Sequence, residues 1–407
     1  MKILFLTDNF PPEANAPATR SFDHCREWVR LGAEVTVITC APNFPQGRVY
    51  DGYTNRPCQR ETVGGIDVIR VWSYIAANAG FAKRILDYIS FAASSVVAGA
   101  FVSADVIVAT SPQFFTAVGG WTLGSAKRTP WVFELRDLWP ESIRAVSAMS
   151  NERVLGALER LELFLYRSAD LIVAVTPAFK ANLVSRGIDG DKIEVVTNGA
   201  DLGVFAPRPP DAELRARLGL EGKFVVGYVG THGMAHNLEG LMAAADRSRD
   251  PSTVFLLIGD GAHKGKVRQV VDEKQLRNVL LLDPVSKDEI ARYWSIVDVA
   301  LVPLRKDPVF TTVIPSKIFE AAAMGKPILL GVEGQAKEIV EQYEAGLCFE
   351  PDDTDDMHAK IERLQHDREL YARLSQNGAI LAADFDRTTL ARRMYQHLET
   401  LVAKHHA

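Results

Sequence analysis

The chain has 407 residues, of which 47% are hydrophobic and 24% are charged. This length exceeds what one ordinary hydrophobic core supports, so we expect two or three domains in a normal globular protein. The formal net charge of −5 and the lack of an RNA- or DNA-binding motif argue against nucleic acid as a partner.

The N-terminal residues 1–8 form an apolar run that is too short for a secretory signal peptide and predicts a first strand. The four cysteines (Cys25, Cys40, Cys58 and Cys348) have neither CxxC nor Cys/His ligand spacing. This pattern predicts free thiols in a reducing compartment and no zinc site. We therefore expect a cytoplasmic protein.

Apolar runs alternate with helical patterns along the whole chain. In the first half they fall at 3–6, 34–39, 68–71, 106–109, 131–135 and 171–175, and residues 195–201 end a further strand in an Asn-Gly turn. After Pro210 they fall at 224–229, 254–258, 279–282, 299–302 and 328–330. Many of these runs are uninterrupted, which is typical of parallel strands covered by helices on both faces. The pattern predicts an α/β protein with two Rossmann-like, doubly wound domains.

A proline-rich segment at 205–211 has the composition of an interdomain connector. We expect an N-terminal domain at 1–202, a C-terminal domain at 203–385 and a helix at 386–407 that packs back across the domains. Open parallel sheets bind ligands beyond the carboxyl ends of their strands. Two such domains facing each other are expected to form a ligand cleft, so the loops that follow the strands are the candidate sites.

Two loops of the first half offer polar side chains. The loop at 11–20 presents Glu13, Asn15 and Arg20 to a polar ligand, or it is a rigid turn. The segment at 133–142 places Arg136, Asp137 and Glu141 around a strand end. Asp137 can orient an acceptor hydroxyl or take its proton. The alternative is a structural ion pair of Arg136 with Asp137 or with Glu134.

The segment at 89–104 carries no charge and follows the basic residues Lys83 and Arg84. It is shorter than the ~20 residues that a membrane span needs. Two interpretations stay open. The segment is a buried helix on the sheet, or it lies on the inner membrane surface through Phe81, Lys83 and Arg84.

In the second half, glycines follow two predicted strands. Gly230 and Gly233 permit close approach of the backbone to a phosphate, and Asn237 can cap the following helix. Gly259 and Gly261 follow the next strand in the same way. Otherwise these are ordinary turn residues, and His232 and His236 are polar loop side chains. No GxGxxG motif occurs in these loops, which argues against a nicotinamide or flavin enzyme.

The segment at 311–330 places Lys317 and Glu320 three residues apart at the start of a helix, after a buried strand. Side chains at this spacing share a helix face. The lysine suits a diphosphate and the glutamate suits hydroxyl groups. Taken alone, the pair would favour the interpretation as an ordinary surface ion pair, but its position between two buried strands reverses this and favours a nucleotide-sugar site. The acidic run at 352–356 is interpreted as a helix start, so no metal is assigned.

Together these segments resemble the retaining glycosyltransferases of GT-B architecture, family four. The resemblance covers nearly the whole chain and includes Asn-Gly-Ala-Asp at 198–201, the Gly230 loop, Gly-Asp-Gly at 259–261 and Pro-Ser-Lys-Ile-Phe-Glu-Ala at 315–321. The loop Arg-Asp-Leu-Trp-Pro-Glu at 136–141 is similar to that of a bacterial subgroup that adds sugars such as N-acetylfucosamine to surface polysaccharides.

The resemblance implies that the second domain binds the donor and the first domain binds the acceptor. Glu320 would bind the ribose and Lys317 the diphosphate. The other implied donor contacts are Gly230, Thr231, His232, Gly233, His236, Asn237, Gly259, Gly261, Thr312 and Ser316. No cofactor or metal is implied besides the UDP-sugar donor. The stereochemistry is retained without a protein nucleophile, because a donor phosphate oxygen takes the acceptor proton.

Two positions depart from the family pattern. Thr312 stands where relatives often have a second glutamate that contacts the donor sugar. The arginine and lysine usual after the Gly230-type glycine are absent, and His232 and His236 lie nearby instead. A deoxy sugar would suit Thr312 better than a fully hydroxylated one.

The expected reaction is transfer of a hexosyl or N-acetyl-(deoxy)hexosaminyl group from a UDP-sugar. The expected acceptor is a glycan or a polyprenyl-diphosphate-linked acceptor at the inner membrane. The reaction would belong to O-antigen or capsule synthesis. Two alternatives are a nucleotide-sugar epimerase of the same fold and a non-catalytic subunit that binds the donor.

Overall fold

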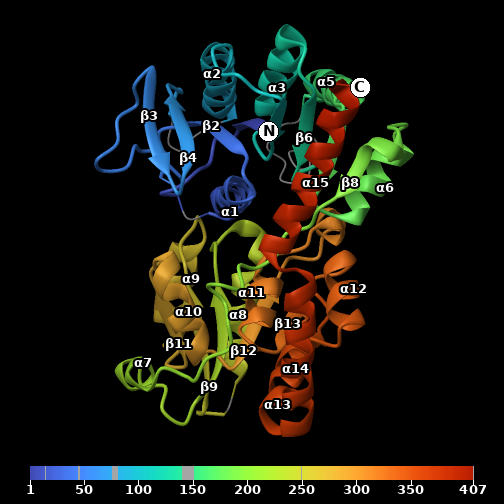
Figure 1. Cartoon of the computed structure of the whole chain (residues 1–407). Coiled ribbons are helices and arrows are strands. Elements are labelled where there is room, and N and C mark those ends of the chain that lie inside the picture. Colours follow the sequence, from blue (N-terminus) through green and yellow to red (C-terminus); the bar gives the residue numbers. More distant parts are fainter. Residues whose placement is uncertain (14, 45, 76–80, 140–150, 249, 407) are drawn as a thin grey trace. The chain divides into compact units, whose positions relative to one another are not determined.

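The computed structural model describes residues 1–407 except 14, 45, 76–80, 140–150, 249 and 407 (Figure 1). The chain forms two compact units. The first unit contains Met1–Thr197 and Arg387–Ala407, and the second contains Asn198–Asp386. The chain therefore passes from the first unit to the second after Thr197, a few residues before the boundary expected at 202. The C-terminal helix, expected to pack back across the domains, is part of the first unit.

The first unit is built on an eight-stranded sheet with the order β3-β4-β2-β1-β5-β6-β7-β8. Its strands are β1 (Lys2–Leu6), β2 (Glu34–Cys40), β3 (Cys58–Val63), β4 (Ile66–Val71), β5 (Val106–Thr110), β6 (Trp131–Leu135), β7 (Leu171–Ala174) and β8 (Ile193–Val195). Neighbouring strands pair in parallel except for the edge pair β3 and β4. Strand β3 was not predicted, because its residues are mainly polar and alternate in exposure.

Helices cover both faces of this sheet. They are α1 (Ala16–Arg30), α2 (Phe81–Gly99), α3 (Phe114–Lys127), α5 (Glu152–Ser168), α6 (Pro177–Ser185), the short 3-10 helix η1 (Gly190–Lys192) and α15 (Arg387–His406). Along β1, Leu4 and Leu6 face one core while Ile3 and Phe5 face the other, as the two-residue period of a strand requires. Helix α15 packs on α1 (Figure 1). At this contact the Trp28 indole Nε1 donates to the Ala391 carbonyl at 2.9 Å.

The second unit contains a six-stranded, fully parallel sheet with the order β11-β10-β9-β12-β13-β14. Its strands are β9 (Phe224–Val229), β10 (Thr253–Ile258), β11 (Val279–Leu282), β12 (Val299–Pro303), β13 (Ile328–Gly331) and β14 (Gly346–Cys348). The last, short strand was not predicted. Its helices are α7 (Ala212–Arg217), η2 (Met234–His236), α8 (Leu238–Arg247), α9 (Lys264–Lys274), α10 (Lys287–Ile296), η3 (Pro308–Thr312), α11 (Lys317–Ala323), α12 (Gln335–Gln342), α13 (Thr354–His366) and α14 (Arg368–Asp384).

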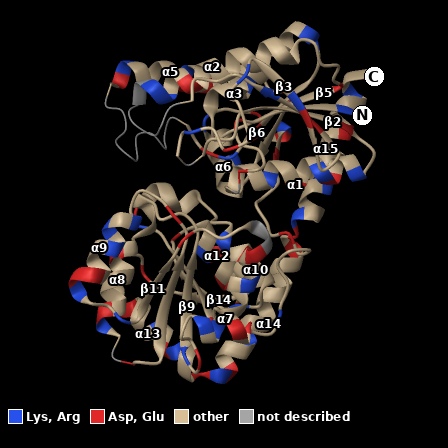
Figure 2. Ribbon diagram, turned by 90° about the vertical axis from the view of Figure 1, so that its left-hand side faces the viewer, with Lys and Arg blue, Asp and Glu red and all other residues tan. Residues whose placement is uncertain are grey.

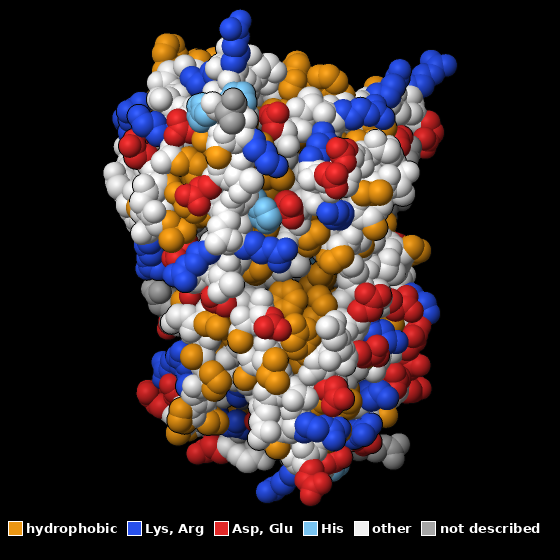
Figure 3. Space-filling model, turned by 45° about the vertical axis from the view of Figure 1, so that its right-hand side comes forward, with side chains coloured by type: hydrophobic (Ala, Val, Ile, Leu, Met, Phe, Trp, Pro, Cys, Tyr) orange, Lys and Arg blue, Asp and Glu red, His pale blue; other side chains and the backbone are white. Residues whose placement is uncertain are grey.

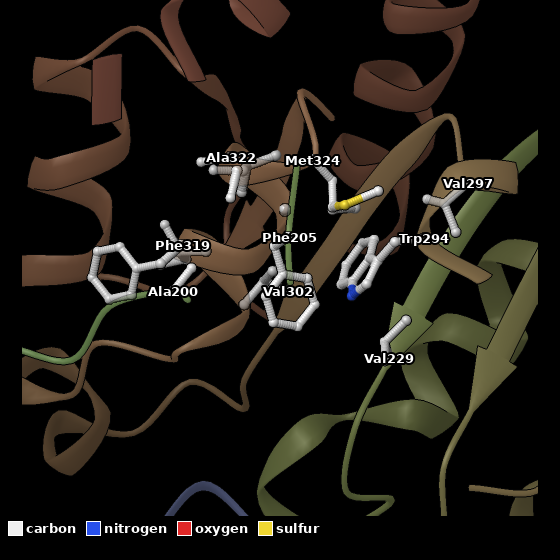
Figure 4. Packing of buried hydrophobic residues seen from close by; sticks show 14 of the residues in the cluster. Ala200, Phe205, Val229, Trp294, Val297, Val302, Phe319, Ala322 and Met324 are labelled. Atoms are coloured by element: carbon white, nitrogen blue, oxygen red, sulfur yellow. The ribbon is translucent and has the colours of Figure 1, made fainter. Parts of the chain in front are cut away.

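Two hydrophobic cores again lie on opposite faces of the sheet. Strand β10 sends Leu256 into one core and Leu257 into the other. In the first of these cores Trp294 lies with Val302 and Met324 (Figure 4). The prediction of an α/β protein with two Rossmann-like, doubly wound domains is therefore confirmed. The prediction that the domains face each other across a cleft stays a prediction.

The surface carries both signs of charge. On the face seen in Figure 3, Lys and Arg side chains are interspersed with Asp and Glu side chains. No helix in the described part of the chain is both long enough and apolar enough to cross a membrane.

Candidate functional site

Three glycines bring the loops after β9 and β10 into direct contact. Gly230, Gly259 and Gly261 have φ angles of 138°, 148° and 152°, a region that residues with a side chain rarely adopt. A Cβ atom on Gly259 would lie 1.9 Å from the Gly230 carbonyl oxygen, and one on Gly261 would lie 2.6 Å from the His232 oxygen. The two loops can therefore approach this closely only where both positions lack a side chain.

Lys317 lies against the same loops. Its ammonium Nζ is 4.7 Å from the centre of the Tyr228 ring and 3.4 Å from the Tyr228 hydroxyl oxygen. The hydroxyl in turn donates to the Thr231 carbonyl at 2.5 Å. A Cβ atom on Gly230 would lie 2.4 Å from Lys317 Cε. The structure thus places the lysine of 315–321 beside the glycine loop at 230, although 87 positions separate them in the sequence.

Burial controls the charges around this lysine. It lowers the pKa of Lys317 to about 8, while the Glu320 carboxylate acts in the opposite direction. Burial also lowers the pKa of His232 to about 4 and that of His236 to about 3. Near neutral pH both histidines are therefore uncharged, and Lys317 supplies a positive charge beside Gly230. The Lys264 ammonium also lies at these loops, where it donates to the Gly259 carbonyl at 2.8 Å and pairs with Asp283 at 2.6 Å. Helix α11 has only seven residues, so the Lys317 ammonium, and not the helix dipole, is the main attraction for an anion.

The remaining predicted donor contacts differ in accessibility. The His232 ring is fully buried, and neither ring nitrogen has a hydrogen-bond partner among the described residues. The prediction that His232 contacts the donor is therefore not supported for its side chain in this conformation. Thr231 is exposed, whereas Gly233, His236, Thr312, Ser316 and Glu320 are partly buried.

Asn237 caps α8 as expected, because its side-chain oxygen accepts from the Gly240 amide at 3.1 Å. Its amide nitrogen donates to Asp352 at 2.6 Å. Arg305, which the sequence did not single out, donates from Nε to the Met234 carbonyl and from its backbone amide to the Ala235 carbonyl, both at 2.8 Å. These bonds fix the turn η2 beside the glycine loop.

In the first unit, Arg20 has an internal role. Its side chain is 3% exposed, and Nε lies 2.9 Å from Glu134 Oε1. Its two terminal nitrogens donate to the carbonyls of Thr197 and Val196, at 2.6 and 3.0 Å. The predicted acceptor contact by Arg20 is therefore corrected: the guanidinium is buried and holds the chain where it leaves the unit.

Glu13 and Asn15 also have internal roles. Glu13 is 3% exposed, and its Oε1 accepts from the Asn43 and Phe44 amides at 2.7 and 2.9 Å. Burial raises the Glu13 pKa to about 7. Asn15 caps α1 by accepting from the Ala18 amide at 2.8 Å. The alternative interpretation of this loop as a rigid turn thus describes both residues better than an acceptor site does.

Arg136 and Asp137 lie directly after β6 and are partly exposed. Arg136 donates to the Pro17 and Ala16 carbonyls at 3.3 and 3.4 Å, and burial lowers its pKa to about 10. The predicted contact by Glu141 lies outside the described residues.

Sequence reasoning missed a further group of acids near Asp137. Burial raises the Tyr88 pKa to about 12, and the charges of Asp8, Asp87 and Asp137 add to this effect. The charges of these three carboxylates therefore all act on one tyrosine. Burial also raises the pKa of Asp87, to about 7, and the pKa of Asp8. Asp8 follows the end of β1, and this position after a parallel strand is the sequence signal that could have identified it as a candidate site residue.

Two glycosyltransferase family models match this chain. Residues 210–380 match the model for glycosyl transferases group 1, and residues 15–199 match that for the glycosyl transferase 4-like domain. The chain belongs to the group 1 glycosyltransferases. WcaI of Escherichia coli, whose name assigns it to colanic acid biosynthesis, is 25% identical over 89% of this chain and 91% of its own length.

Solved structures of this type share the GT-B fold. Sucrose-phosphate synthase from Thermosynechococcus elongatus superposes with a TM-score of 0.81 and 20% identity, over 99% of both chains. HepE of Anabaena, solved in complex with UDP and glucose, superposes with a TM-score of 0.74 and 21% identity, over 98% of this chain and 100% of that one. At these identities the likeness concerns the fold of this glycosyltransferase.

Proposed function

We propose that this glycosyltransferase moves a hexosyl or N-acetyl-(deoxy)hexosaminyl group from a UDP-sugar to a glycan of a bacterial surface polysaccharide. The observation that carries the proposal is the Lys317 ammonium held at the glycine loops of 230 and 259. A partly buried cation beside backbone without side chains suits a diphosphate leaving group. Glu320, one turn along α11, would accept hydrogen bonds from the ribose hydroxyls.

In the proposed reaction the bond between the anomeric carbon and the diphosphate oxygen breaks. The acceptor hydroxyl oxygen forms a bond to the same carbon from the face that the leaving group vacates, which retains the configuration. The hydroxyl proton passes to a phosphate oxygen of the departing UDP. Lys317 stabilises the negative charge that develops on the diphosphate, and no metal or further cofactor takes part.

For the acceptor we propose the group of carboxylates in the first unit, namely Asp8, Asp87 and Asp137. Carboxylates accept hydrogen bonds from sugar hydroxyls and can orient the attacking one. The proposed acceptor is linked to polyprenyl diphosphate at the inner membrane. WcaI, the relative that matches over most of the chain, has a name that refers to a surface polysaccharide.

The proposal is tested by assaying a panel of UDP-sugars with lipid-linked and free glycan acceptors, with and without EDTA. Transfer that depends on an acceptor and resists EDTA is expected. Conversion of the donor without any acceptor would indicate an epimerase instead. Donor binding, seen as a raised melting temperature, without turnover would indicate a binding subunit.

The residue assignment is tested by Lys317→Ala and Glu320→Ala. Each is expected to reduce transfer to about 1% or less, while thermal unfolding stays near that of the unmodified protein. If both variants kept full activity, the site would have to lie elsewhere.

A further inference from the structure

Helix α2 of the first unit has an apolar solvent-facing stripe. Leu86, Ile89 and Val97 are 49%, 46% and 66% exposed, and Ala93 and Ala100 are exposed as well. Their spacing of three or four residues places them along one side of the helix. A surface helix of a globular protein normally presents charged and polar side chains there. Among the described residues of the unit, this stripe therefore has no packing partner.

The opposite side of α2 shows that the helix is properly docked. Phe91 and Ser95 are fully buried, and α2 packs against α3, which in turn contacts α5. Figure 2 shows these three helices together in the same part of the first unit. The apolar stripe is thus the outer face of a packed helix and is not an exposed part of the core.

Two further features lie at the ends of the stripe. Lys83 and Arg84 are exposed in the first turn of α2. Phe101, just after its last turn, is 85% exposed. Residues 81–128 contain four Lys or Arg and two Asp or Glu, whereas the whole chain has a formal net charge of −5. This segment is therefore locally basic in an acidic protein.

We propose that the α2 face, defined as Lys83, Arg84, Leu86, Ile89, Val97 and Phe101, docks on an anionic lipid bilayer. The row of aliphatic side chains and the phenylalanine enter the boundary between headgroups and acyl chains, and the two cations meet lipid phosphates. The helix lies in the plane of the surface. A lipid surface fits better than a protein partner, because the stripe carries no polar atoms to fix a specific orientation while its end carries the cations that anionic lipids attract.

This inference rests on the proposed function only in its biological purpose, which is access to an acceptor held in a membrane. The binding itself requires neither donor nor acceptor. Its failure and that of the proposed transfer can therefore be told apart, because vesicle binding and transfer to a water-soluble glycan are separate measurements.

The test is sedimentation of the full chain with vesicles of phosphatidylglycerol and phosphatidylcholine, and with vesicles of phosphatidylcholine alone. Binding to the anionic vesicles that weakens with salt is expected. The double variant Ile89→Glu with Val97→Glu should lower the partition coefficient at least about tenfold. Lys83→Ala with Arg84→Ala should lower it by about 25-fold at low salt, since each cation near the surface contributes about fivefold.

The matched control is Ile380→Glu on α14, because Ile380 is also an exposed aliphatic residue at 59%. This variant should bind like the unmodified protein. Equal thermal unfolding of all variants shows that they fold. Absence of binding to anionic vesicles would overturn the proposal, and so would unchanged binding of the α2 variants. A loss of dimer mass in light scattering on Ile89→Glu with Val97→Glu would also overturn it, because a second copy of the chain would then cover the face.

Discussion

The two units contain similar parallel sheets but use the polar residues at the carboxyl ends of their strands differently. In the second unit, glycines remove side chains from the loops after β9 and β10, and Lys317 reaches that space as a partly buried cation. In the first unit, Arg20 and Glu134 form a buried ion pair in the corresponding region of the fold. A charged residue after a strand therefore marks a ligand site only if its charge is not already paired with another residue of the same unit.

The largest expected effect concerns the buried pair. Arg20→Ala leaves the Glu134 carboxylate buried without its cation, so we expect the free energy of unfolding to fall by about 3–5 kcal/mol. Urea unfolding measures this loss. The matched control on the same helix is Arg30→Ala, whose 62% exposed side chain pairs with Glu27 and should contribute less than about 0.5 kcal/mol. If Arg20→Ala left the stability unchanged but raised the KM for the acceptor, Arg20 would be an acceptor-binding residue.

Lys317, the cation of the second unit, should affect activity and not stability. Lys317→Ala is expected to lower kcat/KM for the donor by about 10²–10³-fold, because the leaving diphosphate loses its positive partner. The free energy of unfolding of the variant should not fall, because burial disfavours the charged form of this lysine, as its lowered pKa shows. Steady-state kinetics and thermal unfolding measure the two quantities. Normal kcat/KM in a folded Lys317→Ala protein would show that both units use their cations structurally.

The fold could be predicted almost completely from the sequence, because buried parallel strands are uninterrupted apolar runs. Strands β3 and β14 were missed, since the first is mainly polar and the second has three residues. The candidate site could be predicted only in part, and its role stays a prediction. Gly230, Gly259 and Lys317 carry local signals, whereas the place of Tyr228 under the ammonium depends on tertiary packing. Glu13 and Arg20 were misjudged because a sequence does not reveal that a charged side chain is buried.

The close approach of the two glycine loops provides the next test. Gly259→Ala places a Cβ atom against the Gly230 carbonyl at a φ of 148°, so we expect a loss of about 2 kcal/mol or more together with weaker donor binding. Gly265→Ala, in α9, is the control, because its Cβ would meet no atom within 4 Å. Chemical denaturation and UDP titration compare them. Equal behaviour of the two variants would show that the loops can separate without consequence.

The smallest effect is expected at Tyr228. Tyr228→Phe keeps the ring below the ammonium and loses only the hydroxyl contacts, which should cost about 1 kcal/mol of UDP binding or less. Tyr228→Leu also loses the cation–π contact, so a further loss of about 1–2 kcal/mol is expected. Titration calorimetry with UDP separates the two variants. If both variants bound UDP equally, the ring would not position Lys317.

The central claim is that the Lys317 ammonium binds the diphosphate, and the pH dependence of UDP binding tests it without knowledge of the sugar or the acceptor. Because burial lowers the Lys317 pKa to about 8, the unmodified protein should lose up to about tenfold in UDP affinity per pH unit above that value. Lys317→Arg carries a guanidinium that does not titrate in this range, so its affinity should stay nearly constant. The same decline of UDP affinity in both proteins would contradict the claim.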